Sequence, residues 1–476
     1  MKNQGRSFLI AAMAIYLAVV GLLYPLYSAD YFAILGSPNR WLSLIGNELA
    51  VARYTSALGA YLASLVNLDP FETYPVYVAM TAPMVALFLR RLYLRYLALE
   101  PSLALFAVFS FTFLFSGAMF DVLSFREVPH HALLVFVFGY LYLALDDMRS
   151  GLLRAALQAL VIVCLFGTYQ AAVVMVVVLA VMKAMFEVAG GMSAREVGKR
   201  LVGDAVVVLV GLCLSMVVKE AVESYSGVEM VRKFLDYRDS AAVMKRLNEH
   251  AGALVELFRT PGPVYQWAHV GAGLALGLLG YAALALRTGR RAALCLILAA
   301  GLVLLLQDPL NLVGADYWPV LRSSFYVALV PGLLIAFVYS KATAPLLQRW
   351  RAAGLAAFAG LYAVAGTLLL TEAYELRERD AALARAIATS IKSGAEVESI
   401  RITSNWGRVL AANYAGVDGL RFEFGFPLMT VPWSVGPYLK QVTGVDLKYA
   451  GQVQCEDTGA PALRVSERNG VLDVCF

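Results

Sequence analysis

The sequence predicts an all-α polytopic membrane protein with a small α/β domain at its C-terminal end. Three observations predict this fold class. Hydrophobic residues make up 60% of the 476 residues and charged residues 15%, whereas soluble proteins are close to half apolar and about a quarter charged. Apolar runs near the roughly 20 residues of a transmembrane helix recur along residues 1–371. Residues 372–476 are more polar and have the length of one small domain.

About eleven apolar segments are predicted to be transmembrane helices, some of them short. They cover approximately residues 8–27, 73–89, 103–120, 131–146, 155–168, 171–187, 202–219, 265–286, 292–306, 325–340 and 352–370. The first run, Phe8–Leu26, is longer than the apolar core of about 7–15 residues in a secretory signal. We therefore expect a retained first helix rather than a cleaved signal peptide.

Residues Trp41–Leu68 are apolar but are predicted not to cross the membrane. If they do not cross and the N-terminus is cytoplasmic, basic residues collect in the cytoplasmic connections, as the positive-inside rule requires. The cytoplasmic set is Lys2, Arg6, Arg90, Arg91, Arg95, Arg149, Arg154, Lys183, Arg195, Lys199, Arg200, Arg287, Arg290, Arg291, Lys341, Arg349 and Arg351, whereas the short external connections hold only Arg40, Arg53, Arg126 and Arg322. The segment is therefore predicted to be a reclining amphipathic helix, or a pair broken near Gly46, at the outer face.

The C-terminal residues are predicted to form an α/β domain outside the cytoplasm. Glu375–Ser393 has the pattern of an amphipathic helix closed by Gly394, VESIRIT and LRFEFGF resemble strands, and Asn469–Gly470 indicates a hairpin turn. Eleven crossings from a cytoplasmic start place this domain in an oxidising compartment. A disulfide between Cys455 and Cys475 is expected there.

Asp30 follows the first apolar run and has two interpretations. It is either an ordinary interfacial carboxylate that ends the helix, or a general base whose pKa is tuned by partial desolvation. Position alone favours the first interpretation, because charges at helix ends cost little.

Further polar residues fall in the predicted external connections. Arg126 and Glu127 are either a solvated pair at a helix entrance or a phosphate-binding arginine with a carboxylate that orients it or binds a sugar hydroxyl. Tyr169 and Gln170 interrupt a long apolar run, so they need partners, either on other helices or on a ligand. Arg322 is a second candidate for binding phosphate.

Several function classes are disfavoured by what the sequence lacks. No P-loop, GxSxG, HExxH or dinucleotide fingerprint occurs in a suitable context. Charged residues are almost absent from the predicted spans, which argues against an ion-coupled transporter. The net charge of +5 is modest and scattered, so no nucleic-acid partner is expected.

Four short motifs, in order, are similar to those of a known family. They are SADYFAILGSPNRWLSLIGNELA, LSFREVPHHALLVF, GTYQAAVV and YWPVLRSSF. The chain resembles the serotype-converting O-antigen glucosyltransferases of bacteria, or type II glucosyltransferases. This family falls within the GT-C class of glycosyltransferases that use polyprenyl-phosphate sugars. Two features depart from the family pattern: its paired aspartates are Ala29–Asp30 here, and its Gly-Arg is Gly46–Asn47.

The resemblance implies an enzyme of the bacterial inner membrane, with a cytoplasmic N-terminus and a periplasmic C-terminal domain. It implies transfer of a hexose, with glucose expected, from a polyprenyl-phosphate-linked donor to a glycan acceptor such as lipid-linked O-antigen. Asp30 would act as the general base in an inverting displacement. Arg126 and Arg322 would stabilise the leaving phosphate, and the sugar pocket would be lined by Glu127, Tyr169 and Gln170.

Two alternatives to this enzyme stay open from the sequence. One is a transporter or flippase for lipid-linked saccharides, and the other is a non-catalytic assembly partner of the O-antigen machinery. A Mg²⁺ or Mn²⁺ requirement also stays open, and the sequence contains no convincing ligand set for either ion.

Overall fold

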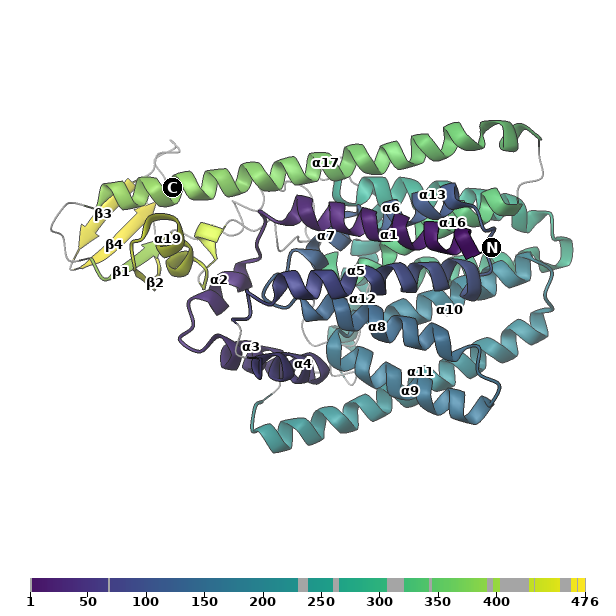
Figure 1. The fold of residues 1–476 in the computed structure, drawn as a ribbon, viewed down its shortest axis with the longest axis horizontal. Helices are drawn as coiled ribbons and strands as arrows, with labels where there is room; N and C mark the ends of the chain where they lie inside the picture. Colours follow the sequence, from purple (N-terminus) through teal and green to yellow (C-terminus); the bar gives the residue numbers. More distant parts are fainter. Residues whose placement is uncertain are drawn as a thin grey trace.

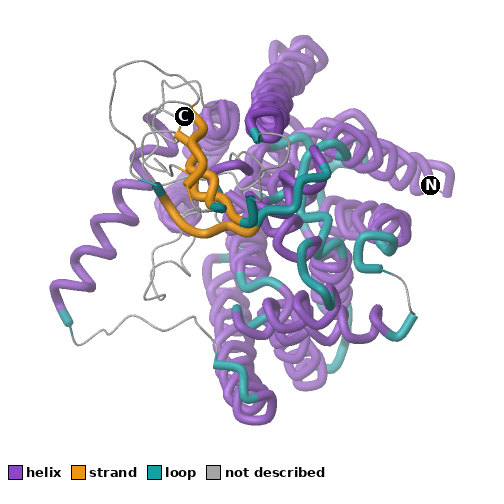
Figure 2. The backbone as a smooth tube through the Cα atoms, turned by 90° about the vertical axis from the view of Figure 1, so that its left-hand side faces the viewer, coloured by secondary structure: helices purple, strands orange, loops and turns teal. Residues whose placement is uncertain are grey.

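The computed structural model describes residues 2–66, 69–229, 239–259, 265–305, 321–341, 345–391, 397–402, 428–431, 433–453, 464–468 and 470–475. It consists of an elongated bundle of helices with a small sheet domain at one end (Figure 1). Figure 2, seen from that end, shows the strands in front of bundle helices that run back behind them. The N-terminus lies at the opposite end of the bundle (Figure 1).

The first part of the bundle contains α1 (Lys2–Leu23), α2 (Ala29–Leu35), α3 (Arg40–Ala50), α4 (Tyr54–Ser64), α5 (Tyr74–Arg91), the π-helix η1 (Leu92–Tyr96), α6 (Leu103–Leu114), α7 (Gly117–Leu123), α8 (His130–Leu145), α9 (Gly151–Thr168), α10 (Ala171–Ala189) and α11 (Ala194–Ser226). The second part contains α12 (Ser240–Arg259), α13 (Tyr265–Leu286), η2 (Gly289–Arg291), α14 (Ala292–Leu305), η3 (Leu321–Ala328), α16 (Leu329–Lys341) and α17 (Pro345–Ser390).

The described helices are those of a polytopic membrane protein. Six of them are long and apolar enough to cross a membrane: α1, α5 with η1, α9, α10, α11 and α17. The pair α6 and α7 is bent by 64° at a short break and would be a seventh span if it crosses as one. Four shorter apolar helices lie in α8, α13, α14 and α16. Each predicted segment falls on one of these helices, and the count of eleven crossings stays a prediction.

The segment predicted not to cross forms two short helices, α3 and α4. Each has 11 residues and so extends about 16 Å, roughly half of the hydrocarbon thickness of about 30 Å. The predicted break near Gly46 is wrong, because Gly46 lies inside α3 and the turn falls at Val51–Arg53. Ala52 in that turn has a φ of 61°. Glycine within a helix costs only about 1 kcal/mol, so Gly46 alone does not end α3.

The helix α17 connects the bundle to the C-terminal domain without a linker. Its 46 residues extend about 69 Å, so the helix leaves the bundle and continues along the sheet domain (Figure 1). The predicted boundary at residue 372 therefore falls inside one continuous helix. The predicted helix from Glu375 is its last part.

The C-terminal domain has a four-stranded sheet in the order β2-β1-β4-β3. The elements are β1 (Ser399–Ile402), η4 (Leu428–Thr430), α19 (Val435–Thr443), β2 (Lys448–Gln452), β3 (Arg464–Arg468) and β4 (Val471–Cys475). β1 is parallel to both neighbours, while β3 and β4 are antiparallel, which confirms the predicted hairpin. Cys475 is disulfide-bonded. Cys455 and the predicted strand LRFEFGF lie outside the described residues.

The helix α2 belongs to the core of the C-terminal domain as much as to the bundle. Tyr31 and Phe32 of α2 are buried in one cluster with Ile400, Leu439 and Val474. The domain is thus fastened to the first connection of the membrane region as well as to α17.

Gly167 allows α4 to lie close to the end of α9. An added Cβ there would lie 2.2 Å from a Tyr54 ring carbon and 2.5 Å from the Thr55 hydroxyl. We expect Gly167→Ala to lower the free energy of unfolding by about 1–3 kcal/mol, as overpacking does, in denaturant titrations in mixed micelles. Gly198→Ala in α11 is the control, because an added Cβ there meets nothing within 4 Å. Equal effects of the two changes would contradict the packing.

Candidate functional site

The start of α2 is tied to the segment that follows α7. The Ser28 hydroxyl caps α2 by accepting a hydrogen bond from the Tyr31 amide at 3.1 Å, and it donates to Glu127 Oε1 at 2.7 Å. Both Ser28 and Glu127 are buried. A buried carboxylate needs polar partners, and here one partner is the cap of the helix that carries Asp30.

Arg126 is enclosed by tyrosine rings. Its guanidinium carbon lies 4.3 Å from the ring centre of Tyr24, 4.7 Å from Tyr27, 4.8 Å from Tyr74 and 6.0 Å from Tyr31. These distances are within the range of cation–π attraction. Nη1 also donates to the Tyr24 carbonyl at 2.9 Å. The arginine thus holds together the end of α1, the start of α2 and the start of α5.

Asp30 lies in the first turn of α2, where the C-terminal domain meets the bundle. Its Oδ1 accepts a hydrogen bond from the Trp433 indole at 3.1 Å, and 52% of Trp433 is exposed. Asp30 itself is half-buried. On the next turn an added Cβ at Gly36 would lie 2.7 Å from the Pro437 side chain, so the two parts are in close contact. The carboxylate is accessible from outside the bundle.

A second cluster of charged groups is buried between α3, α4 and α8. Glu48 accepts from His131 Nε2 at 2.6 Å and from Arg53 Nη1 at 3.4 Å. Burial opposes ionisation of Glu48, but the positive charges of His131 and Arg53 outweigh it and hold the pKa of this carboxyl well below its usual value. Glu48 is therefore a carboxylate whose charge is already neutralised by its neighbours.

The two adjacent histidines bond different partners. His130 Nε2 lies 2.8 Å from the Ser56 hydroxyl of α4, whereas His131 bonds Glu48 of α3. Among the residues that the structure describes, no group of three or more His, Cys, Asp or Glu side chains could hold a metal ion. The Mg²⁺ or Mn²⁺ requirement stays open.

Tyr169 and Gln170 form the break between α9 and α10 and have different roles. Gln170 Nε2 donates to the Val51 carbonyl at 3.0 Å, so its amide holds the turn between α3 and α4. The Tyr169 ring stacks on His131 at 6.3 Å and lies 5.3 Å from the Arg53 guanidinium. Gln170 thus makes a structural hydrogen bond between segments, while Tyr169 reaches the charged cluster.

The charged cluster borders a small, partly open pocket with a cavity volume of about 30 Å³. Three of its lining residues are polar: Arg53, His131 and Tyr169. The others are apolar and come from α7, α8, the segment between them and η3: Met119, Val122, Phe125, Ala132, Val135, Phe136 and Phe325. An apolar pocket with cations at one edge suits an apolar ligand that carries an anionic group.

The predicted site residues therefore lie in two places. Arg126 and Glu127 contact the start of α2, the helix that carries Asp30. Tyr169 lines the pocket, and Gln170 follows it in the chain. The segment from Phe125 to His131 joins the two, since Phe125 lines the pocket and also packs with Ile34 of α2. Arg322 lies in η3, but its side chain is not among those that the structure describes.

The sequence reasoning did not select Glu48, Arg53 or His131 as site residues. A signal for the first two was present, because they are the only charged residues between Trp41 and Leu68. When two opposite charges five residues apart in an apolar segment become buried, each requires the other as an ion-pair partner, because an unpaired buried charge is strongly destabilising.

Comparisons with protein-family models, with curated proteins and with solved structures find no match for this chain. The site is interpreted below from its own geometry and from the motifs in the sequence.

Removal of one partner from the Glu48 cluster should be strongly destabilising. We expect Glu48→Gln to lower the free energy of unfolding by about 3–5 kcal/mol, because it leaves the buried Arg53 charge uncompensated. Asp147→Asn is the control: Asp147 pairs with Arg91 at 2.7 Å but its side chain is 66% exposed, so we expect a loss of at most about 1 kcal/mol. Denaturant titration of both variants makes the comparison, and a small loss for Glu48→Gln would contradict the assigned pairing.

Proposed function

We propose that this protein is a membrane glycosyltransferase that transfers a hexose from a polyprenyl-phosphate donor to a glycan acceptor. The observation that carries the proposal is the pocket with apolar walls and with Arg53, His131 and Tyr169 at its edge. A polyprenyl-phosphate sugar combines an apolar chain with an anionic group, and the apolar walls and cationic edge of this small pocket match the part of that molecule next to the phosphate. The motifs in the sequence supply the reaction type, with glucose as the expected hexose and lipid-linked O-antigen as the expected acceptor.

Asp30 is the better general base of the two carboxylates considered. In the described part of the chain Asp30 pairs with a neutral indole and with no cation, so proton transfer to this carboxylate breaks no ion pair there. Glu48 is held ionised by two cations and its pKa is low, which makes it a weak proton acceptor. Accessibility supports the same choice, because Asp30 is half-buried and Glu48 is fully buried.

The displacement then needs only groups at this end of the bundle. An acceptor hydroxyl oxygen attacks the anomeric carbon, the bond from that carbon to the phosphate oxygen breaks, and the hydroxyl proton moves to Asp30. Polyprenyl phosphate leaves with the bonding electrons, and one direct displacement inverts the anomeric centre. Asp30 and Ile34 are one helical turn apart, and Ile34 belongs to the same buried cluster as Phe125 of the pocket wall.

We assign the leaving phosphate to Arg53 with His131 rather than to Arg126. Arg53 and His131 line the pocket, and guanidinium groups bind phosphate with two charge-assisted hydrogen bonds. Arg126 instead faces tyrosine rings, so its proposed role is to position α2. Glu127 shares that role through Ser28.

Transfer should depend on the Asp30 carboxylate. We expect Asp30→Asn to lower the rate of radiolabelled hexose transfer from polyprenyl phosphate by about 10²–10⁴-fold, the usual contribution of a general base, in an assay with purified protein. Asp446→Asn is the control, since Asp446 pairs with Lys440 at the surface of the C-terminal domain. If the wild-type protein transferred hexose from none of the donors tested, the proposed glycosyltransferase activity would be wrong. Unchanged saccharide flux in Asp30→Asn would instead support the transporter or flippase.

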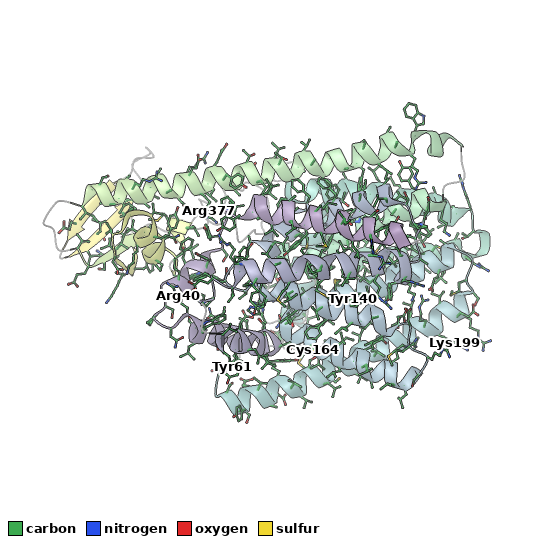
Figure 3. All side chains as sticks on the ribbon, viewed as in Figure 1. Arg40, Tyr61, Tyr140, Cys164, Lys199 and Arg377 are labelled. Atoms are coloured by element: carbon green, nitrogen blue, oxygen red, sulfur yellow. The ribbon has the colours of Figure 1, made fainter. Side chains whose placement is uncertain are left out.

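The proposed orientation places the site on the periplasmic face. In a variant without the exposed Cys213, a cysteine at the exposed Lys440 should react with a membrane-impermeant maleimide in intact spheroplasts. A cysteine at Lys199, at the end of the bundle far from Arg40 and Tyr61 (Figure 3), should react only after permeabilisation. The opposite pattern would invert the assignment of faces.

A further inference from the structure

A basic pocket lies at the end of the bundle opposite to the candidate site. It is lined by Leu87, Arg90, Arg91, Leu94, Arg95 and Tyr140 and has a cavity volume of about 210 Å³. All but Tyr140 come from the end of α5 and from η1, and Tyr140 lies on α8 (Figure 3). The distance from Tyr74 to Arg90 along α5 is about 24 Å, so this pocket is separate from the one at Arg53.

We propose that this pocket binds the phosphate headgroup of an anionic membrane lipid. The three arginines lie at the end of the span Tyr74–Tyr96, where a helix meets the headgroup region. Leu87 and Leu94 supply apolar wall beside them. Basic pockets of this kind between transmembrane helices bind anionic lipid headgroups, and arginine suits phosphate in particular.

The lining residues of α5 and η1 follow one side of a continuous helical segment, because positions 87, 90, 91, 94 and 95 are three or four residues apart. The amide of Leu97 donates to the carbonyl of Leu92 at 2.9 Å, a hydrogen bond between residues five apart as in a π-helix. Arg91 and Arg95 are four residues apart across the junction of α5 and η1, and both line the pocket. Such π-turns are frequent at functional sites.

The arginines of this pocket differ from other basic residues at the same end of the bundle in how far carboxylates neutralise them. Lys183 pairs with Asp146 at 2.5 Å, Arg200 pairs with Glu187, and Arg351 pairs with Glu100 at 3.2 Å. In the pocket only Arg91 has a carboxylate partner within the described residues, Asp147 at 2.7 Å.

The arginines also retain hydrogen-bonding capacity. The Nε atoms of Arg90 and Arg91 are buried and have no hydrogen-bond partner in the described part of the chain. Ordinary basic residues at a membrane boundary extend singly to water. These arginines instead surround a common space with an excess of positive charge, and an anion supplies the missing negative charge.

The test measures lipid retained by the purified full-length chain. Wild type and variants are reconstituted in phosphatidylcholine nanodiscs with increasing phosphatidylglycerol or cardiolipin, and bound lipid is counted by native mass spectrometry. We expect Arg90→Gln/Arg91→Gln/Arg95→Gln to weaken retention of the anionic lipid at least tenfold. The control Arg149→Gln/Arg195→Gln/Lys199→Gln removes the same charge from exposed positions and should change it less than twofold.

Two outcomes would overturn the proposal. Equal losses in the two triple variants would mean general surface attraction and no built site. Retention of added inorganic phosphate without retained lipid would make the ligand a free anion. The single change Arg95→Gln guards against misfolding, because Arg95 is exposed and its loss should still weaken lipid retention severalfold at an unchanged thermal midpoint.

Discussion

Charged residues are buried beside the segment that connects α1 to α5, and they constrain the helices around them. Arg126, Glu127, Glu48 and Arg53 are all buried, and a buried charge without a partner costs several kcal/mol. Their partners come from α1, α2, α3, α5 and α8, so satisfying the charges fixes the positions of these helices. The short helices α2, α3 and α4 are too short to anchor themselves by crossing a bilayer. Polar contacts together with local packing hold them instead.

The burial of charge also gives the carboxylates of Glu48 and Asp30 different environments. Glu48 is surrounded by cations and remains ionised as a structural charge, whereas Asp30 meets an indole at an accessible boundary. Different environments commonly give two acids different roles. Arg126 follows the same logic, because four tyrosine rings and a carbonyl stabilise its charge before any ligand is present. Arg53 is stabilised as well, by Glu48 and the Tyr169 ring, but unlike Arg126 it lines the pocket, and this position is what separates the two arginines.

The sequence was sufficient where a local property decides the structure. Apolar length located the helices of the bundle, and Asn469–Gly470 with its flanking strands located the hairpin, because both signals act between near neighbours. Tertiary contacts decided the rest. The turn after α3 is held by Gln170, 119 residues away along the chain, so no local signal placed it at Ala52. The rings around Arg126 come from three separate parts of the chain. The helix from Glu375 was predicted, but its fusion with the preceding span into one helix was not.

The C-terminal domain packs against α2 and so forms part of the surroundings of Asp30. The rings of Phe32 on α2 and Tyr438 on α19 meet edge to face at 5.1 Å, and Arg377 of α17 donates to the Tyr27 carbonyl at 2.8 Å. Any shift of the domain relative to the bundle would therefore move α2 or break these contacts. The exposed indole of Trp433 donates to Asp30 from about 400 positions further along the chain. The two parts must therefore fold together before the carboxylate has its final surroundings.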